Sequence, residues 1–351
     1  MTPPLVNGAP GYIHRQASYD LVVDGASISG DVYPRLISLG LSERRGTDAD
    51  ELELVLDDSD GRVAIPSPGA EISLRLGWRD LADGGNTSLI NKGTFKVDGR
   101  RHTGTPDRLI IKARSADLTR AFRTRRTQTW TDATLGQVLA DVAGRNGLQS
   151  RVAADKAALA ISHLDQDRES DSAFLARLGR LHDAVATVKA GHLLFAAVGS
   201  GETAGGTPIP PATLTRRDGD RHDWEAPERE NYSGVIAVWQ DRAAATRREV
   251  LVGSASNPKR LGRVYGSQAS ARRAAETNFK RQGRKGATFN LSLARGRPDL
   301  YPEQKLSLSG WKPQIDAADW LIVEARHTLS GNGGLTTSLQ LELGGSPSSS
   351  G

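Results

Sequence analysis

The stretch from Phe289 to Leu343 decides the fold, and it reads FNLSLARGRPDLYPEQKLSLSGWKPQIDAADWLIVEARHTLSGNGGLTTSLQLEL. Apolar residues occupy alternate positions in it, namely Phe289, Leu291, Leu293, Leu306, Leu308, Leu321, Val323, Leu339, Leu341 and Leu343. A period of two is typical of strands with one buried face. Turn-forming residues interrupt the pattern, and the last interruption, Ser330 to Gly334, predicts a hairpin. The stretch therefore predicts an antiparallel barrel or sandwich.

A similar pattern occurs earlier, between residues 66 and 113. Ile72, Leu74 and Leu76 followed by Gly77-Trp78 correspond to Leu306 and Leu308 followed by Gly310-Trp311, His102 corresponds to His327, and Leu109, Ile111 and Ala113 correspond to Leu339, Leu341 and Leu343. We interpret this as two related β-domains in one chain. Gly77, Trp78, His102, Gly310, Trp311 and His327 are then repeat positions, and we expect the two histidines to stabilise turns.

The composition indicates an ordinary folded protein with room for two or three domains. The chain has 351 residues, 37% hydrophobic and 25% charged, and a formal net charge of +5. It has no cysteine, which excludes disulfides, cysteine–zinc sites and thiol catalysis and suits a reducing compartment. No apolar run approaches ~20 residues and the start lacks a secretion-signal pattern, so we expect no membrane association.

Helical periodicity separates the two β patterns and defines the predicted domains. Leu135, Val138, Leu139 and Val142 form one apolar stripe, with Thr131 or Asp132 as the expected cap and Ser170 capping a second helix. The predicted mainly β fold has an N-terminal arm (1–14), a tube-like β-barrel domain (15–124), an α+β insertion (125–205), a second tube-like barrel domain (206–344) with a helix at about 268–282, and a disordered tail (345–351).

An acidic cluster at His163, Asp165, Asp167, Glu169 and Asp171 offers the best candidate for chemistry. On a strand, Asp165, Asp167 and Glu169 would share a face, where carboxylates bind a divalent cation. One alternative function is therefore a metal-dependent enzyme or peptidoglycan hydrolase. We favour a structural interpretation, a strand end followed by a helix start capped by Ser170 and Asp171.

Two basic stretches allow a second alternative, DNA binding. They comprise Arg100, Arg101, Arg108, Lys112, Arg114, Arg120, Arg123, Arg125 and Arg126, and then Lys259, Arg260, Arg263, Arg272, Arg273, Lys280, Arg281, Arg284, Lys285, Arg295 and Arg297. Aromatic residues do not interleave with them, so base stacking has no support, and we expect the arginines to face partner proteins or solvent. Nucleotide-loop, zinc-protease and serine-elbow motifs are absent from the sequence. We predict no catalytic, cofactor-binding or metal-binding residue and no specific nucleic-acid partner.

Several motifs, in this order, resemble the phage late control protein D family of contractile-tail baseplate hubs, which is related to the hub part of type VI secretion spike proteins. They are Leu135-Gly-Gln-Val-Leu, Asp165-Gln166, Glu169-Ser170-Asp171, Phe174-Leu175, Gly296-Arg-Pro-Asp-Leu-Tyr-Pro, Gly310-Trp311, Trp320-Leu-Ile-Val and His327-Thr-Leu-Ser. The resemblance covers nearly the whole chain.

The resemblance implies a non-enzymatic structural protein with two tail-tube-like barrels. It implies a homotrimer whose six barrels form a ring of near-sixfold symmetry, joining a hexameric tail tube or tube initiator to a trimeric spike. Other baseplate proteins and the tape-measure protein are further expected partners. The expected location is the tail baseplate of a virion or injection particle, assembled in the bacterial cytoplasm. No spike or lysozyme-like domain is expected in this chain.

Overall fold

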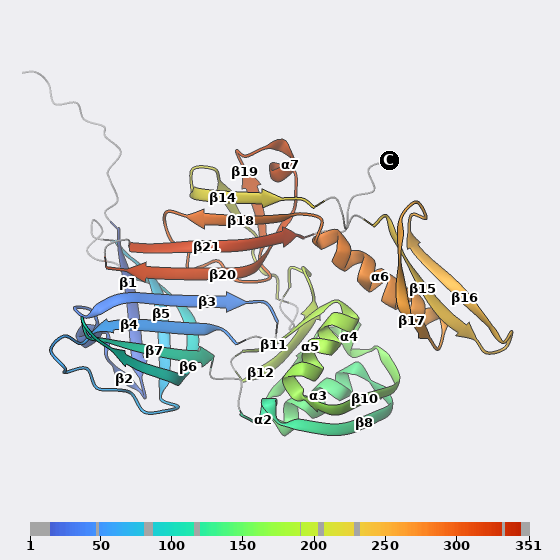
Figure 1. Cartoon of the computed structure of the whole chain (residues 1–351), viewed down its shortest axis with the longest axis horizontal. Helices are drawn as coiled ribbons and strands as arrows, with labels where there is room; N and C mark the ends of the chain where they lie inside the picture. The colour runs from blue at the N-terminus through green and yellow to red at the C-terminus, as the bar shows by residue number, and fades with distance from the viewer. Residues whose placement is uncertain are drawn as a thin grey trace, which may run out of the picture.

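The chain is described here by a computed structural model that covers residues 15–46, 49–80, 87–115, 120–189, 191–202, 207–227, 232–331 and 334–344. Strands predominate (Figure 1), which confirms the predicted mainly β class. The predicted N-terminal extension at 1–14 (called an N-terminal arm above) and the predicted tail at 345–351 lie outside the described residues.

The first β-unit, residues 15–115, wraps its strands around one apolar core. Its elements are β1 (Arg15–Val23), β2 (Ala26–Ser27), α1 (Ser29–Val32), β3 (Leu36–Arg44), β4 (Glu51–Asp57), β5 (Glu71–Asp80), β6 (Thr87–Thr103) and β7 (Arg108–Ser115). Alternate residues such as Leu52, Leu54 and Leu56 are buried in this core, as period-two sequences require.

The second β-unit comprises the strands and one short helix between residues 212 and 225 and between 288 and 343. Its elements are β13 (Ala212–Thr215), β14 (Gly219–Glu225), β18 (Thr288–Leu293), β19 (Lys305–Ser309), α7 (Pro313–Asp316), β20 (Trp320–Ser330) and β21 (Gly334–Leu343). Phe289 and Trp320 pack in its core with ring centroids 5.5 Å apart and the ring planes tilted by 39°. The strands predicted from Phe289 to Leu343 are therefore present.

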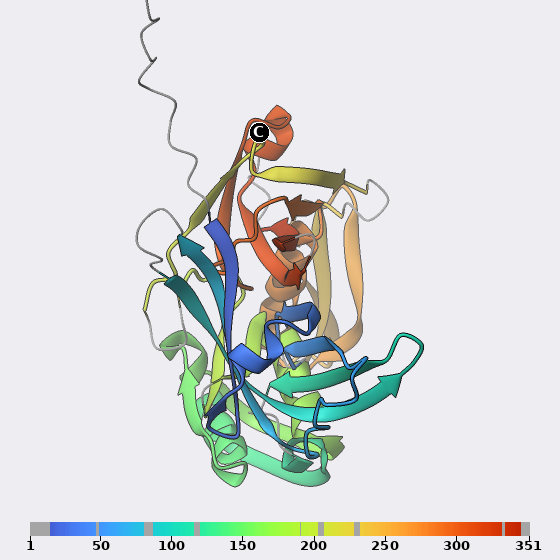
Figure 2. The ribbon, with the colours of Figure 1, turned by 90° about the vertical axis from the view of Figure 1, so that its left-hand side faces the viewer.

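The inserted segment, residues 120–197, packs two small sheets around helices, below the second β-unit and beside the first (Figure 1 and Figure 2). Its elements are α2 (Arg120–Arg123), β8 (Arg125–Thr134), α3 (Leu135–Arg145), β9 (Gln149–Val152), α4 (Ala154–Ala157), β10 (Ala160–Ser170), α5 (Asp171–His182), β11 (Ala184–Lys189) and β12 (His192–Ala197). Ser170 caps α5 as predicted. The predicted cap of α3 was wrong: β8 continues through Thr131 and Asp132, and Thr134 forms the capping box with Gln137.

The arm, residues 234–284, projects from the second β-unit between β14 and β18 (Figure 1). A three-stranded sheet of β15 (Gly234–Asp241), β16 (Thr246–Gly253) and β17 (Pro258–Tyr265) packs against α6 (Gln268–Arg284). Ser267 caps α6, which ends two residues later than predicted.

The two β-units share one continuous sheet. Its order is β14-β18-β21-β20-β3-β4-β7-β6-β5-β1-β2, with β19 and β13 attached beside β20. The sequence predicted two separate barrels, whereas the described strand pairs form one open sheet curling around two cores. The difference arises because β3 of the first unit pairs with β20 of the second.

The two units have corresponding strand orders. The order is β1-β5-β6-β7-β4-β3 in the first unit and β13-β19-β20-β21-β18-β14 in the second. The β6·β7 ladder has a bulge between Val97 and Gly99, and the β20·β21 ladder has one between Ile322 and Glu324. His102 lies three residues after Gly99, and His327 lies three residues after Glu324.

A second pair of bulges matches in the same way. The β3·β4 ladder shifts between Leu36 and Ser38, and the β14·β18 ladder shifts between Gly219 and Arg221. A bulge inserts one unpaired residue at a defined point of a ladder and acts as a register mark. One difference is that β1 runs antiparallel to β5, whereas β13 runs parallel to β19.

Candidate functional site: the seam between the two β-units

The seam is the ladder of β3 with β20, and it joins residues far apart in the sequence. Seven pairs run from Arg44 opposite Glu324 to Ser38 opposite Ser330. On the core side, Leu329 and Leu335 of the second unit are buried in the apolar core of the first. The seam thus combines main-chain hydrogen bonds with apolar burial, the two features of a stable sheet interface.

A buried polar cluster crosses the seam beside this ladder. Nζ of Lys92 lies 2.6 Å from Oε2 of Glu43, and Nε2 of His327 lies 3.1 Å from the same oxygen. Nδ1 of His327 lies 2.8 Å from the hydroxyl of Thr337. The side chains of Glu43, Lys92 and His327 are at most 6% exposed, so the cluster is enclosed by the two units.

The charges in this cluster follow from burial and from the neighbouring groups. Burial alone would raise the pKa of Glu43, but the hydrogen bond to His327 and the charge of Lys92 outweigh it and lower the pKa to about 2. Burial lowers the pKa of His327, and Lys92 adds to the effect. Glu43 is therefore ionised and paired with Lys92, while His327 links Glu43 through Nε2 with Thr337 through Nδ1.

Sequence reasoning singled out only His327 in this cluster. Its predicted role in a turn was wrong, because His327 lies in the middle of the ladder, opposite Leu41 of β3. His102 is different: its side chain is 43% exposed and its Nε2 lies 3.2 Å from Asp58. No local pattern could identify Glu43, Lys92 or Thr337, since isolated polar residues in strands usually face solvent.

The two Gly-Trp positions of the predicted repeat have different local roles, and only Trp78 contacts the other unit. The indole of Trp78 donates to the carbonyl oxygen of Gly296 in the second unit (3.0 Å), and the guanidinium of Arg295 lies 5.2 Å from its ring centroid. Trp311 instead packs edge-on against Phe289 within its own unit, at 5.8 Å.

The two glycines before these tryptophans are required for separate reasons. A Cβ on Gly77 would lie 1.9 Å from the carbonyl oxygen of Ser88 on the neighbouring strand. Gly310 has a φ of +92°, a conformation that L-residues other than glycine rarely adopt.

A second charged network ties the inserted segment and the arm to the second unit. Arg284 of α6 bonds Asp183, with Nη1 at 2.9 Å from Oδ2, and its Nε lies 3.3 Å from Glu342 of β21. Arg45, which follows β3, pairs with Glu303 and with Glu342. The arm, the inserted segment and the seam therefore share one set of buried ion pairs.

The acidic cluster, for which the sequence favoured a structural role over a metal site, is divided among separate structural partners. Asp165 accepts from Thr129 at 2.6 Å, which lowers its pKa, and Glu169 pairs with Arg177 at 2.9 Å. Asp171 is fully buried and bonds Arg145 and Asn146. Arg168, with a φ of +46°, sits at a bulge that breaks the alternation. Among the described residues no group of three His, Asp or Glu side chains converges on a metal position.

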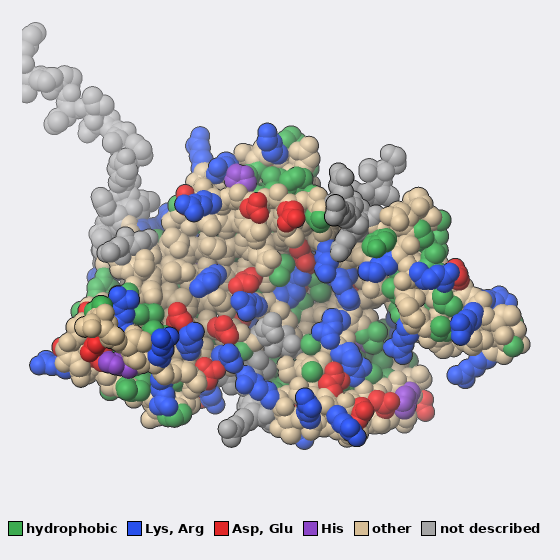
Figure 3. Space-filling view, viewed as in Figure 1, with side chains coloured by type: hydrophobic (Ala, Val, Ile, Leu, Met, Phe, Trp, Pro, Cys, Tyr) green, Lys and Arg blue, Asp and Glu red, His purple; other side chains and the backbone are tan. Residues whose placement is uncertain are grey.

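On the face shown in Figure 3, acidic side chains lie among the basic ones over the first β-unit and the inserted segment, whereas basic side chains predominate over the arm. Several pair with carboxylates, as Lys112 does with Glu53 at 3.1 Å, Arg114 with Glu51 at 3.3 Å and Arg297 with Asp299 at 2.7 Å. In the described part of the chain, no helix is long and apolar enough to cross a membrane.

These features define a class of protein before any comparison: a strand-built structural protein whose best-developed site is a buried contact between two like units. The model of the family described as the phage tail baseplate hub (GPD) matches residues 51–333. The chain belongs to this family, whose members are structural proteins and not enzymes.

Relatives and solved structures agree with the family. The probable baseplate hub protein of Escherichia phage 186 is 38% identical, over 93% of this chain and 92% of its own length. A tail protein from Neisseria meningitidis MC58 has a TM-score of 0.66 at 15% identity, covering 93% of this chain and 96% of its own. An E. coli type VI secretion component has a TM-score of 0.51 at 13% identity, covering 88% and 73%. The two structures share the fold with this chain.

Proposed function

We propose that this protein is the hub of a contractile-tail baseplate, in a phage or a tail-like injection particle, and that it works by assembly. Three copies associate into a ring that presents six similar β-units to a hexameric tail tube and three whole chains to a trimeric spike. The observation that carries this proposal is the shared strand order and bulge register of the two β-units.

The symmetry argument follows from that duplication. A chain with two like units offers two like surfaces, so a threefold ring displays six of them, nearly evenly spaced. The same ring keeps threefold symmetry wherever the inserted segment and the arm contribute, because each occurs once in the chain. One assembly can therefore match a sixfold partner on one face and a threefold partner on the other.

The family and the relatives support a location and a set of partners for this hub. Family membership supports the tail baseplate as the location, with the tube or its initiator, the spike, other baseplate proteins and the tape-measure protein as partners. The repeat positions, from Gly77 and Trp78 to Gly310, Trp311 and His327, are proposed to be structural. No described group of His, Asp or Glu converges on a metal position, and several residues of the basic stretches pair with carboxylates, so we favour neither a hydrolase nor a DNA-binding protein.

The association state tests the proposal. Sedimentation of the purified full chain should give a trimer at micromolar concentration, and electron microscopy of that species should show a ring with six similar lobes. The measurement is repeated with the spike protein of the same particle. A chain that stays monomeric alone and with the spike would overturn the trimeric hub.

A further inference from the structure

We propose that β14 of one copy pairs antiparallel with the end of β6 of a second copy, repeating between chains the β3·β20 ladder found within each chain. The inference rests on the proposed assembly of several copies. It adds the strands, the register and the side chains of the contact.

Both strands of the internal seam have counterparts in the other β-unit. β3 corresponds to β14, because each pairs antiparallel with the next strand and carries a bulge two residues into the ladder. β20 corresponds to β6, because each pairs with the last strand of its unit and carries a bulge three residues before its histidine. If β3 pairs with β20 inside the chain, the counterpart contact is β14 with β6.

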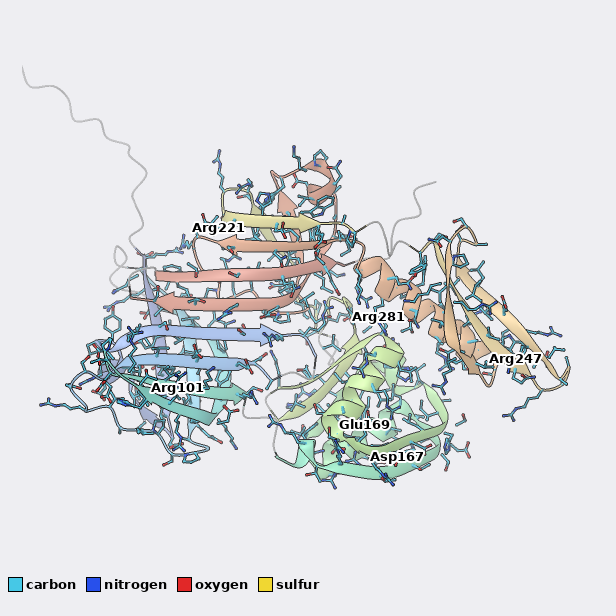
Figure 4. The ribbon with its side chains drawn as sticks, viewed as in Figure 1. Arg101, Asp167, Glu169, Arg221, Arg247 and Arg281 are labelled. Carbon is cyan, nitrogen blue, oxygen red and sulfur yellow. The ribbon has the colours of Figure 1, made fainter. Side chains whose placement is uncertain are left out.

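The counterpart edges have no strand partner among the described residues. β14 ends the sheet order and pairs with β18 alone. The β5 ladder along β6 stops at Lys96. Arg221 on β14 and Arg101 on β6 mark these two regions, which lie at the top and bottom of the stack of strands that runs from β14 to β6 (Figure 4).

The boundary of the free edge on β6 matches that of the occupied edge on β20. Val97 donates to the carbonyl oxygen of Ala70 at 2.9 Å, and Ile322 donates to that of Gln304 at 3.1 Å. Beyond Ile322, from Glu324 onward, β3 occupies the edge of β20. The equivalent edge of β6 runs from Gly99 to Thr103.

The internal seam also fixes the register of the new contact. Within the chain, Ser42 lies opposite Arg326, and Leu41 lies opposite His327. Counting from the matching bulges, Ser42 corresponds to Glu225 and Arg326 to Arg101. The new contact therefore places Glu225 opposite Arg101 and Trp224 opposite His102.

The side chains at these positions suit such a contact. Glu225 and Arg101 are exposed and oppositely charged, and opposite charges directly across two strands stabilise a ladder. Trp224 is 41% exposed, whereas its counterpart Leu41 is fully buried in the internal seam. Leu329 and Leu335 supply apolar contact at the internal seam. The corresponding residues in the hairpin after β6 are Gly104 and Asp107, which supply little. The large ring of Trp224 would provide apolar contact in their place.

The open edge of β14, which has no strand partner among the described residues, points to a second copy as its occupant. An exposed edge strand with an aromatic side chain is a ready template for another strand, and folded proteins normally cover one. The edge that matches it in register and charge belongs to this same chain. A tube or spike protein on β14 is the competing outcome of the test.

Disulfide cross-linking tests the register, since the natural chain has no cysteine. Paired residues across strands have the Cα separation that a disulfide needs. The test variant is Arg101→Cys/Glu225→Cys in the full chain. Ser42→Cys/Arg326→Cys, directly paired inside the chain, is the positive control. Arg101→Cys/Arg221→Cys is displaced by four residues, about 13 Å along the strand, and is the negative control.

Mild oxidation should link Arg101→Cys/Glu225→Cys chains into dimers and then into a closed covalent ring on a non-reducing gel. The positive control should remain a single chain with an internal disulfide, and the displaced pair should give at least about tenfold less interchain product. Trimers by sedimentation without this cross-link would overturn the seam while leaving the hub intact. Monomers without cross-links, both alone and with the spike protein, would overturn both.

Discussion

At the scale of single residues, the buried cluster of Glu43, Lys92 and His327 is the most exacting feature of the molecule. It sets a charged pair and a neutral imidazole inside the contact between two units, where desolvation makes an unpaired charge costly. Such a cluster specifies which strands meet, because any other register would leave Glu43 without its partners. It therefore acts on specificity more than on net stability.

Lys92→Met should destabilise the protein by about 3–5 kcal/mol, since it leaves the carboxylate of Glu43 buried without its cation. Urea unfolding of the full chain measures this change. Lys112→Met is the matched control, because Lys112 also pairs with a glutamate but its side chain is 64% exposed, and its expected cost is about 0–1 kcal/mol. Equal costs for the two variants would contradict the enclosed charge pair.

His182 predicts how stability changes with pH. Burial, together with the charges of Lys156 and Arg273, lowers the pKa of His182 from 6.5 to about 4. The unfolded chain then binds the proton more readily, so this contribution is complete above pH 6.5 and is lost as the pH falls toward 4, by up to about 3 kcal/mol. His327 acts in the same direction.

His182→Gln should flatten the dependence of the unfolding free energy on pH between 4 and 6.5, leaving the part due to His327. His163→Gln is the control, because the side chain of His163 is 61% exposed. Unfolding curves at a series of pH values give the slope for each protein. An unchanged slope for His182→Gln would show that this imidazole is protonated in the folded chain.

At the scale of elements, one glycine in β5 sets how closely two strands approach. Gly77→Ala should cost about 1–3 kcal/mol or more, because the added methyl group meets the carbonyl oxygen of Ser88 rather than a movable side chain. Gly40→Ala in β3 is the control, as nothing lies within 4 Å of its Cβ position, and its effect should stay within about 0.5 kcal/mol. Thermal and urea unfolding of both variants compare the two sites.

Element type could be predicted from the sequence because alternation and capping are local signals. The strands of Phe289 to Leu343 and the Ser170 cap of α5 follow from residues a few positions apart. The sequence also predicts the proposed repeat, but it pairs some positions incorrectly. Counted from the matching bulges, Leu109 corresponds to Thr337 and not to Leu339. The reason is that the two hairpins, β6–β7 and β20–β21, have a different number of residues between paired strand positions. The sequence alone does not show this difference.

The seam was not predictable by the same means. β3 and β20 lie far apart in the chain, and an alternating strand gives no indication of which distant edge it will join. The acidic residues of β10 show the converse: the shared face considered for Asp165, Asp167 and Glu169 is broken by a bulge at Arg168, which alternation in the sequence does not reveal. Strand register and bulges depend on tertiary contacts. They determine both the β3·β20 seam and the separation of the acidic side chains on β10.

At the scale of the whole molecule, the two β-units leave one ladder closed inside the chain and two matching edges open. Pairing an open edge of each copy with the next generates a chain of units, which is finite only when it closes into a ring. The inserted segment and the arm occur once in each copy, so they would mark every second unit of the proposed ring. A duplicated chain is thus a simple way to place threefold features on a nearly sixfold frame.

The charges at the open edges predict how this ring responds to mutation. Glu225→Arg would set two cations opposite each other in the proposed register and weaken each contact by about 1 kcal/mol, roughly a fivefold rise in its dissociation constant. The double variant Arg101→Glu/Glu225→Arg should recover most of the loss, because it restores an opposite pair. Glu249→Arg, an exposed acid on β16 of the arm, should leave association unchanged. Sedimentation at low and high salt measures all four proteins, and the differences should shrink as salt screens the exposed pair. Failure of the double variant to recover association would place Glu225 and Arg101 in separate contacts, and the ring would then have to close through other strands.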